Sequence, residues 1–167
     1  ALDDETSQLV VDLIKEVNRR NQTTIIAITH HFSLAYELDG ITMVMYDGAV
    51  VEVGPTQKII RQPKHPYTRG LLNSTTEFNP YKDIWGIKAG ARNRQGCPFF
   101  HRCTQALPAC QFDTYHLDQV EGDQESYIYC YRGGLVDLLT VSNLRKSFGE
   151  AEILRSEEHT SELQSQR

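Results

Sequence analysis

Residues 23–30 have the sequence TTIIAITH, and this short apolar stretch decides the expected fold. Its side chains are mostly β-branched and do not alternate with polar ones, which is typical of a strand buried on both faces. Strands of this kind occur in parallel sheets that helices cover on both sides. We therefore predict an α/β fold in which residues 23–29 form a buried parallel strand that ends directly before His30.

Patterns on either side of this stretch predict the neighbouring elements. Apolar residues recur at helical spacing over residues 4–20, so a helix should precede the strand. An Asp47-Gly48 pair separates two β-rich runs, residues 41–46 and 49–53. This pair favours a hairpin, because both central turn positions need a positive φ. Short helices are also predicted over residues 33–38, 55–62 and 66–74.

The composition excludes several classes of protein. The 167 residues include 17 Lys and Arg, 22 Asp and Glu, and 40% hydrophobic residues, with a formal net charge of −5. This mixture argues against a disordered chain, a collagen-like chain and a strongly basic nucleic-acid binder, so no nucleic-acid partner is expected. No run approaches the ~18 to 20 apolar residues that cross a bilayer, and no secretory signal is recognisable.

All four cysteines fall within one segment, separated by five, six and nineteen residues. Without a secretory signal, metal ligation is a better interpretation than disulfides. Common zinc sites use pairs that lie closer together, but four thiolates suit either zinc or an iron–sulfur cluster. Four unrelated buried thiols are the less favoured alternative. The predicted metal ligands are Cys97, Cys103, Cys110 and Cys130.

His30 is a candidate for ligand contact, because open parallel sheets bind ligands at the carboxyl ends of their strands. An imidazole there can donate a hydrogen bond to an anion or orient a water. From this feature alone we favour a histidine that merely fills the loop. The sequence contains no GxxxxGK[ST] phosphate loop, no zinc-type His-Glu helix and no nucleophile elbow, so it holds no complete catalytic apparatus.

Taken together, roughly residues 1–130 resemble the C-terminal part of an ATP-binding subunit of an ABC transporter, in the oligopeptide/dipeptide importer group. Several motifs carry this resemblance. They are residues 1–3 (end of the D-loop), 28–30 (H-loop), 45–55 (terminal hairpin) and 65–72, HPYTRGLL (the stretch that marks the peptide-importer extension), together with the cysteine pattern, which is similar to [4Fe–4S] ligation.

The resemblance implies a partial P-loop NTPase domain with a parallel sheet, flanking helices and a terminal hairpin, followed by a cysteine-rich metal-binding extension. It implies that the longer protein uses ATP with Mg²⁺ to drive peptide transport. His30 would hydrogen-bond the γ-phosphate, and Asp3 would act at a dimer interface. The cysteines would hold a [4Fe–4S] cluster, with zinc as the alternative. The phosphate loop, signature motif and catalytic glutamate are expected upstream of Ala1, so residues 1–167 alone should be inactive.

The resemblance also implies partners and a location. The partners are membrane permease subunits, a second ATP-binding domain and, indirectly, an extracytoplasmic solute-binding protein. The expected place is the cytoplasmic face of the membrane, as a peripheral subunit. The expected segments are 1–74 (ABC ATPase part), 75–132 (cysteine-rich extension), 133–154 (linker and possible second domain) and 155–167 (tail).

The last part of the chain supports two further expectations. Residues 138–149, LLTVSNLRKSFG, resemble the opening strand of a second ABC ATPase domain, with Phe148 at the position that stacks on adenine. The parent would then be a tandem two-ATPase protein; the alternative is an edge strand that closes the cysteine segment. Residues 155–165 resemble the translation of a sequencing adapter, so the tail is expected to be artefactual.

Two other functions stay open at this point. A soluble tandem ABC ATPase that acts in assembly or repair would share His30 and Asp3, although the HPYT stretch and the cysteines favour the importer. A metal-binding interaction module on an α/β scaffold is the other alternative. Absence of a phosphate loop from the upstream coding sequence would favour that module.

Overall fold

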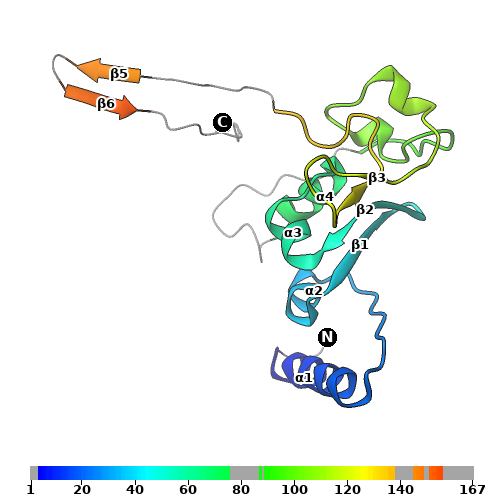
Figure 1. Cartoon of the computed structure of the whole chain (residues 1–167). Coiled ribbons are helices and arrows are strands. Elements are labelled where there is room, and N and C mark those ends of the chain that lie inside the picture. Colours follow the sequence, from blue (N-terminus) through cyan, green and yellow to red (C-terminus); the bar gives the residue numbers. More distant parts are fainter. Residues whose placement is uncertain (1–3, 76–86, 88, 138–144, 149–150, 156–167) are drawn as a thin grey trace. The chain divides into compact units, whose positions relative to one another are not determined.

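A computed structural model describes residues 4–75, 87, 89–137, 145–148 and 151–155. Contacts divide the chain into two units, Ala1–Gly134 and Leu135–Arg167. The elements of the first unit are α1 (Asp4–Asn21), α2 (Phe32–Leu38), β1 (Ile41–Tyr46), β2 (Ala49–Pro55), α3 (Thr56–Arg61), α4 (Pro66–Asn73), the 3₁₀ turns η1 (Phe100–Arg102) and η2 (Pro108–Gln111), β3 (Asp118–Gln119) and β4 (Tyr127–Ile128) (Figure 1).

The predicted hairpin is confirmed. Strands β1 and β2 pair antiparallel, with a bulge between Val44 and Met45. The turn residues Asp47 and Gly48 have φ values of 50° and 82°, the positive angles that the Asp-Gly pair predicted. The helices predicted around the hairpin are also confirmed, as α1, α2, α3 and α4.

The hairpin and the cysteine-containing segment share one sheet. Strand β2 pairs antiparallel with β4 through Glu52↔Ile128 and Val53↔Tyr127, and β4 pairs antiparallel with β3. The strand order is therefore β1-β2-β4-β3. Because Tyr129 also donates its backbone N–H to the Val51 carbonyl at 2.9 Å, the end of β4 is fixed to the middle of β2.

Among the residues of this unit that the structure describes, three small clusters of buried side chains form the core. One lies under the hairpin, where Val44 and Val51 pack with Ile59 of α3. The other two belong to the cysteine segment. Their members are Cys97, Phe99, Cys110 and Tyr129 in one cluster, and Val120, Ile128 and Cys130 in the other. Cys97, Cys110 and Cys130 are thus core residues of this segment, and the partly buried Cys103 packs against the first of these clusters.

The strand predicted over residues 23–29 is wrong for this structure, and the parallel sheet predicted around it is not formed by the described residues. These residues form an extended connection between α1 and α2, and every strand pair in the described residues is antiparallel. Ile26 and Ile28 are 88% and 99% exposed. A strand persists only where neighbours pair its backbone N–H and C=O groups, and no described strand lies beside this segment.

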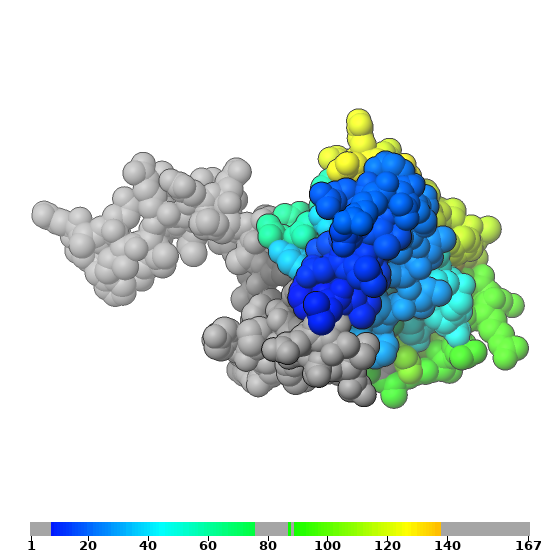
Figure 2. Space-filling model, turned by 90° about the horizontal axis from the view of Figure 1, so that it is seen from below, coloured from blue at the N-terminus to red at the C-terminus, as the bar shows by residue number. Residues whose placement is uncertain are grey.

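The N-terminal residues, coloured blue, lie at the front of the face that Figure 2 shows. Besides the isoleucines above, this region exposes Leu9 (69%) and Leu13 (60%) of α1. The helix is therefore amphipathic, as its spacing predicted, but its apolar stripe is not covered by the described residues.

In the second unit, β5 (Arg145–Phe148) and β6 (Ala151–Arg155) form an antiparallel pair with a bulge between Lys146 and Ser147. The strand predicted from residue 138 falls mostly on residues 138–144, outside the described part of the chain, and so does most of the predicted tail. Among the described helices of both units, none is long and apolar enough to span a lipid bilayer.

Candidate functional site

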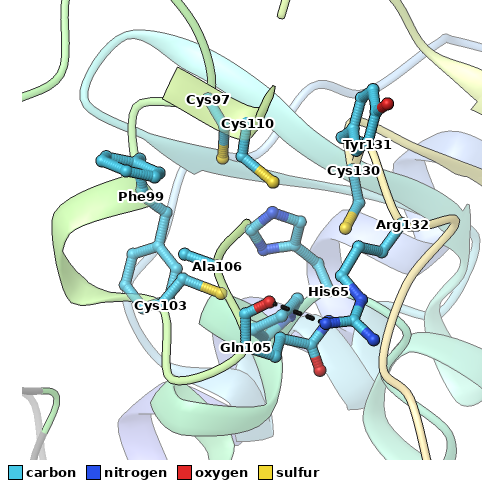
Figure 3. Close-up of a pocket in the computed structure, with 12 residues that line it drawn as sticks. His65, Cys97, Phe99, Cys103, Gln105, Ala106, Cys110, Cys130, Tyr131 and Arg132 are labelled. Atoms are coloured by element: carbon cyan, nitrogen blue, oxygen red, sulfur yellow. Dashed lines mark hydrogen bonds between the residues drawn. The ribbon is translucent and has the colours of Figure 1, made fainter. Parts of the chain in front are cut away.

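The four cysteines line one pocket of the first unit. All four are free thiols; Cys103 is half-buried and the other three are buried. Figure 3 shows their sulfur atoms directed toward the space around the ring of His65, which lines the same pocket. The structure therefore brings together the four predicted ligands, although 33 positions separate the first from the last in the sequence.

Backbone hydrogen bonds place Cys97 beside Cys110. The N–H of Cys97 donates to the Cys110 carbonyl at 3.0 Å. The buried side-chain amide of Asn93 donates to the carbonyls of Cys97 (3.1 Å) and Gln111 (3.0 Å). These bonds join two stretches of chain that would otherwise have no regular secondary structure to hold them.

Gly96 makes this approach possible. A Cβ atom at this position would lie 2.5 Å from the carbonyl oxygen of Gln111 and 2.6 Å from that of Cys110. Both neighbours are backbone atoms that cannot move aside independently. The close approach of the two cysteine-bearing stretches therefore requires glycine here.

The sheet brings the fourth cysteine to the pocket. Cys130 follows β4 directly, and Tyr129 is held to β2 by the hydrogen bond to Val51 described above. A turn then closes after it, with the Gly133 N–H donating to the Cys130 carbonyl at 2.8 Å. Pairing between β2 and β4 is thus the feature that places Cys130 against the other three cysteines.

Aromatic rings join the pocket to the hairpin and to α4. The rings of Tyr46 and Tyr67 have centroids 4.6 Å apart, and Phe99 meets them edge-on at 5.3 Å and 5.4 Å. The guanidinium of Arg102 lies 5.9 Å from the Tyr46 ring centroid, within cation–π range. The pocket wall is therefore packed directly on the end of the hairpin.

Burial controls the electrostatics of the thiols. It raises the pKa of Cys97 to about 12, and it also raises the pKa values of Cys103 and Cys130, because thiolate anions are poorly solvated there. The neighbouring sulfurs add to this effect at Cys97. In this state these three thiols are protonated and weakly reactive, so a metal that binds them must displace their protons.

Four cysteine side chains are chemically suited to bind a metal, but their positions in this structure are not those of a metal site. Within the described ranges, no group of three or more His, Cys, Asp or Glu side chains is placed to hold a metal ion. The open space in the pocket is about 20 Å³, room for about one water molecule. The cysteines therefore have the right chemistry for a metal centre, but loading it requires their side chains to rearrange.

Two buried residues of this region were not predicted as site residues. Glu52, only 1% exposed, accepts the backbone N–H groups of Lys64 (2.6 Å) and His65 (3.0 Å) with its carboxylate. Burial raises the pKa of Glu52, and these two hydrogen bonds oppose the shift. Burial lowers the pKa of His65 to about 4, so its ring is neutral. A single acid within the apolar run of β2 is the sequence signal that could have singled out Glu52.

His30, which was predicted to serve a nucleotide site, is not among the residues that line the cysteine pocket. His30 is exposed at a bend directly before α2, with its ring centroid 4.1 Å from that of His31. Asp3 lies outside the described residues. Phe148 is the last residue of β5 in the second unit. The predicted roles of these three residues stay predictions.

Comparisons with known proteins agree with the motifs. Residues 51–110, from β2 through most of η2, match the family described as "Oligopeptide/dipeptide transporter, C-terminal region". The chain is 32% identical over 139 residues to "Dipeptide transport ATP-binding protein DppD" of Caldanaerobacter subterraneus subsp. tengcongensis, an alignment that covers 80% of this chain and 43% of the relative.

Relatives with the same name occur in Haemophilus influenzae (35% identity over 116 residues, 66% of this chain and 35% of the relative) and Escherichia coli K12 (30% over 131 residues, 75% and 40%). The chain thus spans less than half the length of these relatives. Together with the mixed helix and sheet fold, the matches define the class as ABC-type ATP-binding proteins. Within this class the chain belongs to the oligopeptide/dipeptide group. It corresponds to the C-terminal part of a protein of this group.

Proposed function

We propose that the full-length protein is the ATP-binding subunit of an ABC importer for oligopeptides, dipeptides or related solutes, and that it couples ATP hydrolysis to their transport. The match over residues 51–110 carries this proposal, because it includes the HPYT helix and three of the four cysteines. The printed names of the relatives, dipeptide transport ATP-binding proteins, support the same substrate class.

In this proposal His30 donates a hydrogen bond to the γ-phosphate of ATP and holds the attacking water in line. Asp3 acts across the interface between two ATP-binding domains. Phosphoryl transfer of this kind depends mainly on positioning and electrostatic stabilisation, which a single donor can supply. The exposure of His30 supports the role, because a nucleotide can reach its ring.

The proposed partners follow from the same function. The protein would attach to membrane permease subunits at the cytoplasmic face of the membrane and pair with a second ATP-binding domain. An extracytoplasmic solute-binding protein would deliver the peptide to the permease. We also propose a tandem arrangement, in which β5 and β6 begin a second ATP-binding domain and Phe148 stacks on adenine. The antiparallel β5–β6 pair in a unit of its own supports this arrangement.

For the cysteine pocket we propose a [4Fe–4S] cluster with a structural or regulatory role, and zinc as the alternative. The convergence of four free thiols on one pocket supports the donor set. A cluster bound to all four cysteines would cross-link a segment that buries few apolar side chains. In small domains of this kind, metal binding contributes on the order of 10 kcal/mol to the free energy of folding. The cysteine segment is proposed as an extension to the ATPase part, with the boundary near residue 75.

Reconstitution tests the proposed function. The full-length protein, assembled with its permease subunits in lipid vesicles, should hydrolyse ATP with Mg²⁺ and drive uptake of a labelled dipeptide. ATP hydrolysis without any membrane partner, combined with no binding to the permease, would instead favour the soluble tandem ATPase. Failure to bind ATP at all would favour the metal-binding interaction module.

A further inference from the structure

Glu52 is a buried acid in the middle of β2, with an apolar neighbour on each adjacent strand. In the sheet register it lies opposite Val44 of β1 and Ile128 of β4, and all three side chains are buried. Residues directly opposite each other in antiparallel strands place their side chains on the same face of the sheet. A carboxylate in such surroundings is unfavourable unless hydrogen bonds replace its lost water, so the partners of this carboxylate indicate its role.

The partners of this carboxylate are two consecutive backbone N–H groups directly before α4. Oε1 accepts the N–H of Lys64 at 2.6 Å, and Oε2 accepts the N–H of His65 at 3.0 Å, so each oxygen serves one donor. Pro66 has no N–H, and the N–H of Tyr67 donates to Nδ1 of His65 at 3.0 Å. The backbone donors of this stretch are thus all satisfied, two of the three by Glu52.

The stretch that Glu52 holds forms part of the cysteine pocket. His65 and Pro66 line this pocket together with the four cysteines. Figure 3 shows the ring of His65 among the four sulfur atoms, and the centroid of this ring lies 6.0 Å from that of Phe99 in the pocket lining. A movement of this stretch away from β2 would therefore open one wall of the pocket.

The main chain beside Glu52 supports the pocket as well. Its pairing partner Ile128 lies two residues before Cys130, and the Tyr129 N–H between them donates to the Val51 carbonyl of β2 at 2.9 Å. One short segment of β2 therefore holds the end of β4 through backbone pairing and the start of the HPYT stretch through a side chain.

We propose that Glu52 is a positioning residue of the cysteine pocket, whose carboxylate holds the start of the HPYT stretch against the sheet and so keeps His65 in the pocket wall. This role concerns the pocket with its cysteines as free thiols, so it does not depend on whether they bind iron, zinc or neither. It gives the single acid in the apolar run of β2 a task outside the proposed nucleotide chemistry.

Two substitutions separate the hydrogen bonds of Glu52 from the volume that its side chain fills. Glu52→Gln keeps the shape, but its amide has only one oxygen, and its NH₂ group faces the second N–H donor. Glu52→Met has a similar length and no strong acceptor for either donor. If Glu52 merely filled space, methionine would be the better replacement, because well-packed apolar residues are often neutral or stabilising in place of buried charges.

Hydrogen–deuterium exchange on the full-length protein, as purified, measures the two donors directly. We expect the amides of Lys64 and His65 to exchange roughly tenfold faster in Glu52→Gln, and faster still in Glu52→Met, since buried donors lose their acceptor. Residues 41–46 of β1 should keep their wild-type rates, because their ladder hydrogen bonds do not involve the carboxylate. Exchange in Glu52→Met as slow as in Glu52→Gln, or equal acceleration in β1, would overturn the proposal.

Alkylation of the cysteines provides a second readout. After chelator treatment under reducing conditions, iodoacetamide should label the pocket cysteines several-fold faster in Glu52→Met than in wild type, because the wall that contains His65 is loosened. Glu121→Gln changes an exposed acid of the turn before β4 and is the control, which should match wild type in both measurements. Labelling at the wild-type rate in both Glu52 variants would also overturn the proposal.

Discussion

Lys58 of α3 and Asp123 of the β3–β4 turn form an ion pair with a distance of 2.9 Å between Nζ and Oδ1, although 65 positions separate them in the sequence. The same Nζ lies 2.9 Å from a carboxylate oxygen of Glu125. Asp123 also accepts the backbone N–H of Glu125 (3.0 Å) and the hydroxyl of Ser126 (2.9 Å). The pair thus fixes the turn before β4 to the helix that follows β2.

This network predicts that the free energy of unfolding depends on pH in the acidic range. The hydrogen bond from Lys58 lowers the pKa of Asp123 to about 2, from a value of 3.8. Between these two values the unfolded chain binds more protons than the folded one, so the free energy of unfolding falls as the pH is lowered through this window. Above the pKa of 3.8 of the unfolded chain, the contribution of Asp123 to stability is fully present. Denaturant titrations at a series of pH values measure it.

Asp123→Asn should reduce this acid sensitivity, because the group that titrates is removed. The exposed acid Glu121 lies in the same turn, so Glu121→Gln is the matched control and should leave the profile unchanged. A profile for Asp123→Asn identical to that of wild type between these two pH values would contradict the prediction.

Gly96→Ala should destabilise the cysteine segment by about 1–3 kcal/mol, the usual cost of overpacking. The added methyl group would meet the carbonyls of Gln111 and Cys110 at 2.5–2.6 Å, so the backbone must shift. Thermal or denaturant unfolding of the full-length protein measures the change.

Gly70→Ala is the control for this change. Gly70 lies within α4, and its new methyl group would lie 3.3 Å from the flexible side chain of Ile87. Alanine is the better helix former by roughly 1 kcal/mol, so this variant should be nearly neutral or slightly more stable. If Gly96→Ala were as stable as Gly70→Ala, the close approach around Gly96 would be wrong.

The proposed cluster predicts the metal content of the purified protein. Anaerobic preparation should yield a brown protein with a broad visible absorption band and about four irons per chain. Cys97→Ser and Cys130→Ser should each lose most of the iron, because each removes one thiolate from the donor set. Elemental analysis and absorption spectra measure both effects.

Ala106→Ser is a suitable control for the cysteine variants. Ala106 lines the same pocket, so the substitution introduces a hydroxyl group without removing a thiol. This variant should keep its iron. One zinc per chain with no visible band would refute the cluster and favour the zinc alternative.

The proposed role of His30 predicts a defect in hydrolysis. In the full-length protein, His30→Ala should lower the rate of ATP hydrolysis about 100- to 1000-fold, the usual cost of losing a preorganised donor to the transition state. ATP binding, measured by nucleotide fluorescence, should change far less. His116→Ala replaces another exposed histidine and should keep the wild-type rate. Equal rates for His30→Ala and wild type would remove His30 from the site.

Some elements could be predicted from the sequence because their signals are local. The Asp47-Gly48 turn requires positive φ at two adjacent residues, and the helices α1, α3 and α4 follow from spacing and Pro placement over a few turns. The HPYT stretch and the cysteine pattern also indicated the transporter group before any contact was known. The turn and helix signals are each complete within about twenty neighbouring residues, and the cysteine pattern within 97–130.

The fate of residues 23–29 could not be predicted in this way. Their β-branched composition favours a strand, but a strand needs neighbours to pair its backbone groups, and the described residues provide none. Propensity is therefore a weak prior that tertiary context overrides. The place of His65 was hidden for the same reason, because its backbone N–H bonds to Glu52, 13 positions away, and its ring lines the cysteine pocket.

The sequence by itself determined the family of this protein, the hairpin, the helices and the identity of four candidate ligands. Only the tertiary structure decided that β4 pairs with β2, that Cys130 thereby joins the other three cysteines, and that the buried Glu52 carboxylate accepts the backbone N–H of His65, a residue of the pocket. The physical reason is the range of the interactions. Turn angles and helical periodicity depend on adjacent residues, whereas strand pairing and buried hydrogen bonds join residues that only the folded chain brings together.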